Sequence, residues 1–483
     1  MTDIKNLEPK NVFDFFAKIC KIPHGSGNTK AISDFCVNFA RKHGYKFVQD
    51  SANNVVIFAD GTSGYENSEP VILQGHIDMV CDKTADCNKD MQTDSLDLQT
   101  DGEFVWAQNT TLGGDDGIAV AYMLALLNDK TIAHPPIEAV FTADEEIGMI
   151  GTRKLDTSIL KGKMLINIDS EQEGVLTVSC AGGVRANCEL PVKFEVNNDI
   201  QYCVKIRGLK GGHSGVEINQ NRTNANKLMI RMLQFVYLYR DISFKIADIN
   251  GGTKENAIPN QSTATLCIPE NQCESFVESV SFFREIINDE FSVFEPGLKI
   301  SVEKTGKAKK SMTESSTRNV IFTLSQMPDG VQAMSPDIKD MVQTSLNMGI
   351  LRTEKDKIFM KYLVRSNAAA GKQTLVRKLQ AVIEYSGGTI EFCSDYPAWE
   401  YRADSKLREI MIDAYAKFYK SQPVVTSIHA GLECGILAGK IEDMDAVSFG
   451  PNLYNVHTAQ EKMDVKSVER CWQYLKAVLK KCK

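Results

Sequence analysis

Residues 71–78, VILQGHID, show the pattern on which much of the chain is built: a short apolar run ends in a histidine and an acid. Similar runs end in acidic residues in AVFTADEE, residues 139–146, and in MLINID, residues 164–169. Such short runs predict buried strands, and the apolar residues 117–127 between the first two predict a helix. Strands that alternate with helices indicate an α/β fold with a mostly parallel sheet and helices on both faces.

Side chains suited to metal binding or proton transfer directly follow the three predicted strands. They are His76, Glu145, Glu146 and Asp169. In open α/β sheets, ligands bind at the carboxyl ends of the strands. The pattern therefore places these four side chains where a functional site is expected.

The pattern changes after about Gly183 and returns after about Pro397. Between these points, a helical run at 224–238 and a strand-like run at 357–364 belong to strand-helix-strand units. Such units indicate an inserted α/β domain with its sheet covered on one side. We predict the first part of a catalytic domain at residues 1–187, a lid domain at 188–396 and the second part of the catalytic domain at 397–483.

Charge and cysteine content argue against several classes of protein. The chain has 55 basic and 62 acidic residues, a net charge of −7, which leaves no basic footprint for nucleic acid or anionic membranes. The most apolar predicted helix, 118–127, is too short to cross a bilayer, and no secretory signal is visible at the N-terminus. Thirteen cysteines without CxxC pairs fit free thiols in a reducing cytosol. We expect a cytoplasmic protein with no nucleic-acid or membrane partner.

Two histidines and three carboxylates are candidate metal ligands. They are His76, Asp115, Glu146, Asp169 and His457. Nitrogen and oxygen ligands of this kind suit Zn²⁺, with Mn²⁺ or Co²⁺ as substitutes. Two metals can share a bridging water and one carboxylate, so five ligands suffice if Asp115 bridges. Glu145 then remains free to move protons.

Each of these motifs taken alone has a simpler interpretation. His76 and Asp78 form an H-x-D pair, a weak signal in which Asp78 can hold the second ring nitrogen of the histidine. Asp115 in its glycine-rich turn is also explained by ordinary helix capping. The acids 144–146 fit a solvated loop, although adjacent carboxylates repel one another unless cations compensate. The joint occurrence of all these features favours a metal centre.

Longer segments of the chain, and the spacing between them, resemble the aminoacyl-histidine dipeptidases. These are cytosolic nonspecific dipeptidases (Xaa-His dipeptidases) of the zinc-peptidase superfamily that includes carnosinase and carboxypeptidase G. The segments are GHIDMV at 75–80, TTLGGDDG at 110–117, LKGGHSG at 209–215, NGGTKENAIP at 250–259 and IHAGLECG at 428–435. The resemblance covers essentially the whole chain. It implies a di-zinc catalytic domain with a lid domain, commonly paired as a homodimer.

The resemblance also implies roles for the candidate residues. The metal ligands divide into His76 and Asp169 on one metal, Glu146 and His457 on the other, and Asp115 between them. Glu145 becomes the general base, and Asp78 orients His76.

Four residues of the predicted lid domain and of the segment 428–435 are implied to bind substrate. His213 would polarise the scissile carbonyl, while Asn256 and Arg365 would lie near the C-terminal carboxylate of the substrate. Gly431 would add backbone contacts. Simpler interpretations remain: His213 in GGHSG shapes a turn, and Arg365 forms a surface ion pair of the lid.

The expected function is hydrolysis of unblocked dipeptides, including Xaa-His, by a bridging metal-bound hydroxide with Glu145 as general base. One alternative is an N-acyl-amino-acid deacylase or a carboxypeptidase on the same scaffold. Another is a non-catalytic peptide-binding protein. The chain departs from the family in having Asp115-Asp116 where Asp-Asn is frequent, and in the residues on either side of His457, where G-P-H-S is usual.

Overall fold

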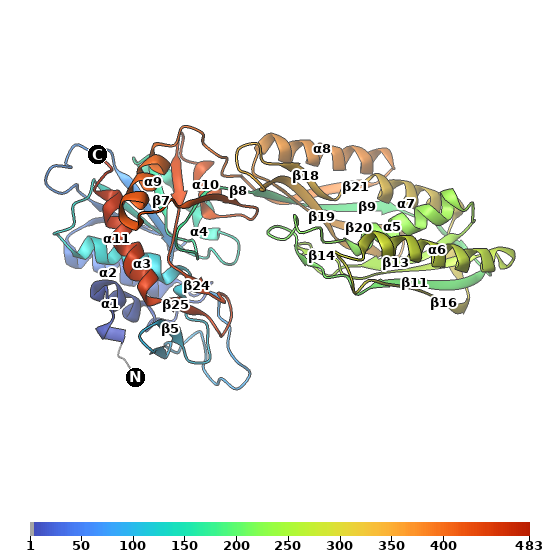
Figure 1. Ribbon diagram of the computed structural model, residues 1–483, viewed down its shortest axis with the longest axis horizontal. Helices are drawn as coiled ribbons and strands as arrows, with labels where there is room; N and C mark the ends of the chain where they lie inside the picture. The colour runs from blue at the N-terminus through green and yellow to red at the C-terminus, as the bar shows by residue number, and fades with distance from the viewer. Residues whose placement is uncertain (1–3) are drawn as a thin grey trace. The chain divides into compact units, whose positions relative to one another are not determined.

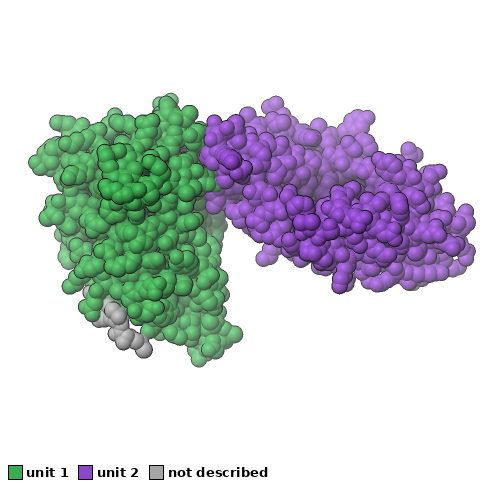
Figure 2. Space-filling model, viewed as in Figure 1, with its two compact units in different colours: residues 1–179, 401–427, 432–483 green, residues 180–400, 428–431 purple. Residues whose placement is uncertain are grey.

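The structure is a computed structural model that describes residues 4–483, and it divides into two compact units (Figure 2). Unit 1 consists of the described residues up to Ser179, with Tyr401–Ser427 and Leu432–Lys483. Unit 2 consists of Cys180–Glu400 and Ile428–Gly431. The boundaries between the two units lie between residues 179 and 180 and between residues 400 and 401. Unit 2 thus extends a few residues beyond each limit predicted for the lid domain. It also includes a four-residue segment from further along the chain, Ile428–Gly431.

Unit 1 contains an eight-stranded mixed sheet (Figure 1). Its strands, in sheet order, are β1 Lys46–Gln49, β2 Val55–Ala59, β6 Ile137–Thr142, β3 Val71–His76, β7 Met164–Asn167, β23 Asp445–Ser448, β8 Val175–Cys180 and β22 Val424–Ile428. The four central strands from β6 to β23 are parallel, whereas β1, β2 and β8 join by antiparallel pairs. The α/β class is confirmed. The sheet is parallel at its centre, where the predicted strands lie, and the hydrogen bonds from Val424 to Gly174 and from Ala181 to Ile428 show that the edge strand β22 also runs parallel to β8.

Strand β3 shows why this sheet is covered on both faces. All six of its residues are buried. A Cβ atom on Gly75 would lie 2.5 Å from Cβ of Ala119 in helix α3 (Gly114–Asn128). The neighbouring Gln74, whose side chain points to the opposite face because strand residues alternate, donates to Glu433 of α10 (Glu433–Ala438) at 2.5 Å.

The central helix α3 is buried along almost its whole length, which explains its apolar sequence. The Tyr122 ring stacks on Trp472 of α11 (Val465–Leu479) at 5.8 Å, and its hydroxyl donates to the carbonyl of Val468 at 2.8 Å. No helix within residues 4–483 combines the length and apolarity that a membrane crossing requires. The helices of unit 1 besides α3 and α10 are η1 Ile4–Asn6, α1 Lys10–Ile19, α2 Lys30–His43, α4 Ile150–Lys154, η2 Thr157–Ile159, α9 Lys406–Tyr419 and α11 Val465–Leu479.

A small second sheet of unit 1 brings a late part of the chain beside an early one. It contains β24 Leu453–Tyr454, β25 Lys462–Asp464, β5 Phe104–Ala107 and β4 Leu98–Thr100. Strand β25 pairs with β5, and the connection from β24 to β25 carries His457.

Unit 2 is built on a large antiparallel sheet. In sheet order its strands are β16 Lys299–Lys307, β11 Ile200–Arg207, β15 Ser262–Ile268, β13 Lys245–Gly251, β19 Val342–Thr353, β20 Lys357–Ser366, β9 Gly182–Pro191 and β21 Thr389–Tyr396, with β18 Gly330–Met334 paired to β19. Alternate residues of β11 are buried, from Ile200 to Ile206, and those between them are partly exposed. One face of the sheet is therefore covered, as the sequence predicts.

The helices of unit 2 contribute to the same apolar core as the buried strand residues. They are α5 Ala225–Gln234, the π-helical η3 Phe235–Tyr239, α6 Cys273–Phe291, α7 Glu314–Gln326 and α8 Ala369–Tyr385. The short η4 Glu270–Gln272 has no buried residue. Two short ribbons complete the unit: β10 Phe194–Val196 with β17 Lys310–Met312, and β12 Gly212–His213 with β14 Ala257–Ile258. The helix predicted at 224–238 is confirmed, and Asn224 caps it by accepting the N–H of Asn226 at 2.9 Å.

Candidate metal centre

His76 ends strand β3 and is buried, with its two ring nitrogens in different surroundings. The Nδ1–H group donates to the backbone carbonyl of Asp78 at 3.0 Å, and the Asp78 carboxylate lies 3.5 Å from the same nitrogen. The other nitrogen, Nε2, lies 2.9 Å from Oδ1 of Asp115 and 3.8 Å from Oδ1 of Asp169. The ring is thus held by one nitrogen and presents the other to carboxylates, which is the arrangement of a metal-binding histidine.

Asp78 fixes the acidic loop that follows β6. Its carboxylate accepts the backbone N–H groups of Glu145 at 3.0 Å and Glu146 at 3.4 Å, and the hydroxyl of Ser26 at 2.8 Å. Burial alone would raise the pKa of Asp78, but His76 and these hydrogen bonds hold it below its usual value. The residue therefore contributes a fixed negative charge that orients both His76 and the loop.

Asp115 lies between the two histidines. Its Oδ1 is 2.9 Å from Nε2 of His76, and its Oδ2 is 3.1 Å from Nε2 of His457. The carboxylate faces the imidazoles, so helix capping does not account for it. One carboxylate with an oxygen toward each of two ligand histidines has the geometry of a metal bridge.

Glu146 and His457 form the second side of the cluster. Oε1 of Glu146 lies 2.8 Å from Nε2 of His457, yet among the described residues this buried oxygen has no hydrogen bond of acceptable geometry. The nearby carboxylates of Asp115 and Glu146 raise the pKa of His457 to about 10. A buried carboxylate oxygen without a donor fits a position where a cation binds.

Asp169 follows β7, and its carboxylate completes the cluster beside His76. Burial, reinforced by the negative charge of Asp116, raises the pKa of Asp169 well above its usual value. Burial likewise raises the pKa of Glu145 to about 8, although nearby His76 opposes the shift. Carboxylates crowded in this way disfavour one another's ionisation, and a bound cation would relieve that repulsion.

The donor atoms of the cluster fit divalent metal ions. Three groups have all their ligand atoms within 4.8 Å of one another: His76 with Asp116 and Asp169, His76 with Glu145 and Glu146, and Asp115 with Glu146 and His457. Imidazole nitrogens and carboxylate oxygens are the ligands of zinc and of related metals. A ligand imidazole must be neutral, so metal binding here would release protons from His76 and His457.

Asp116 lies beside His76, and the sequence alone assigned no role to this residue. Its Oδ2 accepts the backbone N–H of His76 at 3.2 Å, and a Cβ atom on Gly75 would lie only 2.5 Å from the same oxygen. Burial raises the pKa of Asp116 well above its usual value. The shift favours its neutral form, so the extra acid adds less negative charge than the sequence indicates.

Two buried glutamates support the cluster, and sequence reasoning did not single out either. Glu433 accepts from Gln74 at 2.5 Å, from Thr142 at 2.7 Å and from Thr152, and so ties α10 to β3, β6 and α4. Glu461 accepts backbone N–H groups of the turn before Asp115. Glu433 lies within the segment 428–435 that carries the family resemblance, but neither position has a spacing that marks it.

The predicted substrate residues lie in unit 2. A Cβ atom on Gly215 would be 2.9 Å from Cε1 of His213 and 3.2 Å from Nε of Arg365, so these side chains meet around this glycine. Asn256 is exposed and is linked to the same turn, because its carbonyl accepts the N–H of Ser214 at 2.9 Å. Gly431 belongs to unit 2 through the segment 428–431.

His213 stabilises the turn that follows it through one ring nitrogen, and its other ring nitrogen can serve a second role. Its Nδ1 accepts the N–H groups of Gly215 at 3.1 Å and Val216 at 3.2 Å. Burial and nearby Arg365 lower the pKa of His213, so the ring is neutral and carries its proton on Nε2. An Nε2–H donor of this kind can polarise a carbonyl group.

Arg365 is buried, with 6% of its surface exposed, which argues against a surface ion pair. Nη1 donates to the hydroxyl of Tyr396 at 3.3 Å, while Nε is buried without a hydrogen bond among the described residues. Burial and the charge of Arg365 lower the pKa of His429 to about 3. Its Nδ1–H donates to Oδ1 of Asn367 at 3.1 Å, and its Nε2 accepts from Ser345 at 2.7 Å. Burial and the charge of Arg185 lower the pKa of Arg365, which has no ion pair with a carboxylate among the described residues and can bind an anion.

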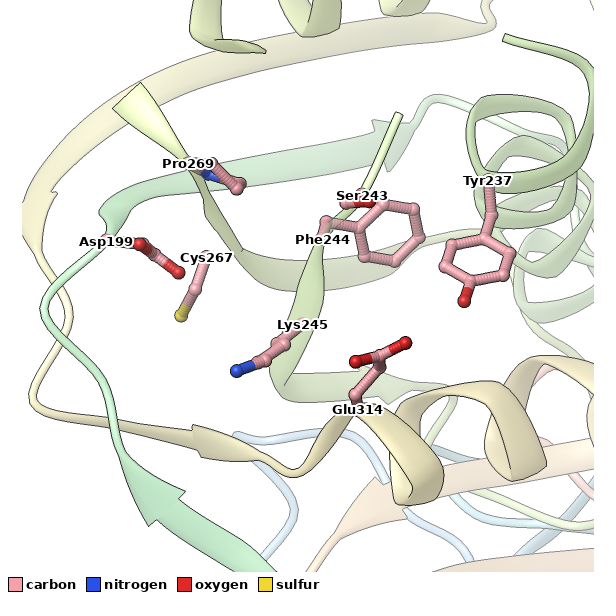
Figure 3. A pocket seen from close by; sticks show the side chains of 8 residues that line it. All are labelled: Asp199, Tyr237, Ser243, Phe244, Lys245, Cys267, Pro269 and Glu314. Atoms are coloured by element: carbon pink, nitrogen blue, oxygen red, sulfur yellow. The ribbon is translucent and has the colours of Figure 1, made fainter. Parts of the chain in front are cut away.

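A small cavity of unit 2 lies apart from these residues (Figure 3). Its volume is about 170 Å³, and Lys245 on its wall is paired with Glu195 at 2.6 Å. The lining side chains are Asp199, Tyr237, Ser243, Phe244, Lys245, Cys267, Pro269 and Glu314. None of the predicted site residues lines it.

Imidazoles and carboxylates gathered beside the carboxyl ends of central parallel strands are the arrangement that a metal-dependent hydrolase of the α/β class requires. The comparison with known families is more specific. Residues 72–481 match the family described as Peptidase family M20/M25/M40, and the chain belongs to this family.

Two relatives match over nearly the whole chain. The cytosol non-specific dipeptidase of Escherichia coli (strain K12) is 34% identical over 487 residues, which cover 99% of each chain. The crystal structure of aminoacylhistidine dipeptidase from Vibrio alginolyticus superposes with a TM-score of 0.95 at 36% identity, covering 99% of this chain and 98% of that one. A tripeptidase structure from Staphylococcus aureus, with a TM-score of 0.59 and 14% identity, shares the fold. The resemblance drawn from the sequence motifs is confirmed.

Proposed function

We propose that the chain is a metal-dependent dipeptidase that hydrolyses unblocked dipeptides, including Xaa-His. The observation that carries the proposal is the position of Asp115, with one carboxylate oxygen toward His76 and the other toward His457. The near-complete match to two dipeptidases supports the substrate class.

Two zinc ions per subunit are the proposed cofactors, with Mn²⁺ or Co²⁺ as substitutes. The ligands are His76 and Asp169 on one ion, Glu146 and His457 on the other, and Asp115 between them. When bound, the pair would supply Lewis-acid chemistry and lower the pKa of water.

Glu145 is the proposed general base. Its backbone N–H is held by Asp78 at 3.0 Å, and burial raises the pKa of its carboxyl group to about 8. A carboxylate with a raised pKa accepts a proton from water more readily near neutral pH and can deliver it to the leaving amine.

The residues of unit 2 are proposed to bind the remainder of the dipeptide. The Nε2–H group of His213 donates to the carbonyl oxygen as negative charge develops there. Arg365, with Asn256 and Gly431 beside it, binds the free carboxylate, for which a planar guanidinium is well suited.

The location and assembly of the protein complete the proposal. A cytoplasmic location follows the name of the Escherichia coli relative and agrees with the thirteen free cysteines. A homodimer is proposed from the family resemblance.

The experiment compares cleavage of a free Xaa-His dipeptide and of its N-acetylated analogue by chelator-stripped protein, before and after Zn²⁺ is added. Restored cleavage of the free dipeptide alone supports a metallodipeptidase. Cleavage of the acetylated compound instead indicates a deacylase. If neither is cleaved with metal present, the proposal fails and a binding protein becomes the better description.

A further inference from the structure

Glu461 makes an unusual set of contacts for a carboxylate in a loop. It is buried, with 2% of its surface exposed. Its Oε2 accepts the backbone N–H groups of Leu112 at 2.8 Å and Gly113 at 3.1 Å, and its Oε1 accepts that of Gly114 at 2.8 Å. One side chain thus binds three consecutive N–H groups of the turn that leads into Asp115, and its Oε1 also accepts the N–H of Asp115 itself at 3.5 Å.

The turn is shaped to receive this carboxylate. Gly113 has a positive φ of 68°, and a Cβ atom there would lie 2.8 Å from Sδ of Met79. A Cβ atom on Gly114 would lie 3.2 Å from Oε1 of Glu461, closer than side chains ordinarily approach. Successive N–H groups that point to one side form a concave anion site, and here the anion is a side chain of the same protein.

Glu461 also belongs to the connection that carries His457. Its own N–H donates to the carbonyl of Thr458 at 3.0 Å, which closes a turn directly after the histidine. The next residue begins β25, and this strand is anchored to β5 by antiparallel pairing. The two segments that Glu461 joins are therefore the ones that supply Asp115 and His457, whose side chains approach to 3.1 Å.

We propose that Glu461 is a positioning residue of the metal centre, which fixes the Asp115 turn against the His457 loop so that both ligands reach one metal ion. This inference rests on the proposed function only in that it takes Asp115 and His457 as ligands. Outer residues that hold the ligands of a metal typically affect its affinity by about 10–100-fold.

The simpler role for Glu461 is to cap the start of α3, and Glu138 offers the matched control. Glu138 is also buried in unit 1, at 4% exposure, and its carboxylate accepts the N–H groups of Lys161 at 2.8 Å and Gly162 at 3.0 Å. It lies at the start of β6, at the end of the strand opposite to the proposed ligands. A purely structural role predicts that substitutions at the two positions behave alike.

The experiment measures Zn²⁺ affinity of the full-length Glu461→Gln and Glu138→Gln proteins by competition with a chromophoric chelator. In Glu461→Gln one carboxylate oxygen becomes an amide NH₂ group, which cannot accept an N–H group of the turn. We expect the Zn²⁺ dissociation constant to rise about 10–100-fold for Glu461→Gln and to stay at the wild-type value for Glu138→Gln. Equal Zn²⁺ affinity in the two variants overturns the proposal.

Two further measurements separate positioning from loss of fold. The thermal midpoints of the metal-free variants report the structural cost, which we expect to be similar for the two substitutions. Excess Zn²⁺ should restore the kcat of Glu461→Gln toward wild type, whereas a damaged fold would not respond.

If Glu461→Gln does not fold, Glu461→Asp is measured in its place, because aspartate keeps the charge on a shorter side chain. A wild-type affinity in that variant contradicts the proposal.

The outcomes also distinguish this inference from the proposed function. If the wild-type protein binds zinc and Glu461→Gln binds it weakly, the inference stands even when no dipeptide is cleaved. If both bind zinc equally well and cleave dipeptides, the proposed function stands and the inference fails.

Discussion

The predicted site residues of unit 1 and those of unit 2 have opposite excesses of charge. In unit 1 the carboxylates dominate, and those of Asp115 and Glu146 raise the pKa of His457 to about 10. In unit 2, burial and Arg365 lower the pKa of His429 to about 3, and Nε of Arg365 has no hydrogen bond among the described residues. The first group is short of positive charge and the second of negative charge. Charge balance thus indicates a cation for unit 1 and an anionic group for unit 2.

The largest effect is expected from Glu145→Ala, which separates metal binding from turnover within unit 1. We expect kcat to fall about 10²–10⁴-fold, because a general base contributes in this range. The zinc content should remain that of the wild type, since the proposed ligands are intact. Steady-state kinetics with metal analysis measure both quantities. Turnover close to wild type would refute the assignment of Glu145 as the base.

Removal of the metal should lower the stability of unit 1 and leave the stability of unit 2 unchanged. A ligand present at 100 times its dissociation constant stabilises the state that binds it by about 2.7 kcal/mol. We therefore expect a chelator to speed amide hydrogen exchange in β3 and α3 of the full chain, with little change in β11 and β15. Exchange followed by mass spectrometry measures this. Equal acceleration in both units would remove the distinction between them.

Arg365→Lys tests the anion-binding character of unit 2. Lysine keeps the charge but loses the planar fork, and hydrogen bonds to charged groups contribute about 1.5–3 kcal/mol, or roughly 10–100-fold in binding. We expect KM to rise by up to this factor with zinc affinity unchanged. The matched control is Arg185→Lys on the neighbouring strand β9, where the arginine is partly exposed and paired with Glu255 at 3.0 Å. If both variants change KM equally, Arg365 has no special role.

The smallest effect is expected from Asp116→Asn. The amide oxygen of asparagine can still accept the N–H of His76, so we expect kcat/KM to change by less than about tenfold, the equivalent of one net hydrogen bond. Asp116→Ala leaves that buried N–H unpaired and should be more damaging. Kinetic comparison of the two variants decides the point, and an equal loss in both would show that the hydrogen bond does not matter.

Much of unit 1 follows from local sequence pattern. His76 and Asp169 were placed correctly at strand ends because apolar runs reveal strands and because ligands gather at the carboxyl ends of parallel strands. The approach of His457 to Asp115, over 342 positions in the chain, has no local signal. Residue type alone grouped the two among five candidate ligands, and only the family resemblance implied which of these ligands share a metal ion.

The features that the sequence did not predict are those whose partners are backbone atoms or distant segments. Glu461 binds N–H groups, and any residue supplies these, so no side-chain pattern marks its partner. The segment 428–431 joins unit 2 although it is too short to differ in composition from its neighbours. The antiparallel edges of the unit 1 sheet were missed because short strands at an edge carry no signal of their direction.

Strand β23 has a consequence for synthesis of the protein. It lies between β7 and β8 in the middle of the sheet, yet its residues, Asp445–Ser448, leave the ribosome after those of every strand of the unit 2 sheet. His457 and Glu461 emerge later still. A nascent chain can therefore complete the sheet of unit 2 while the sheet of unit 1 still lacks a central strand. The proposed metal ligands therefore cannot all come together before His457 has been synthesised.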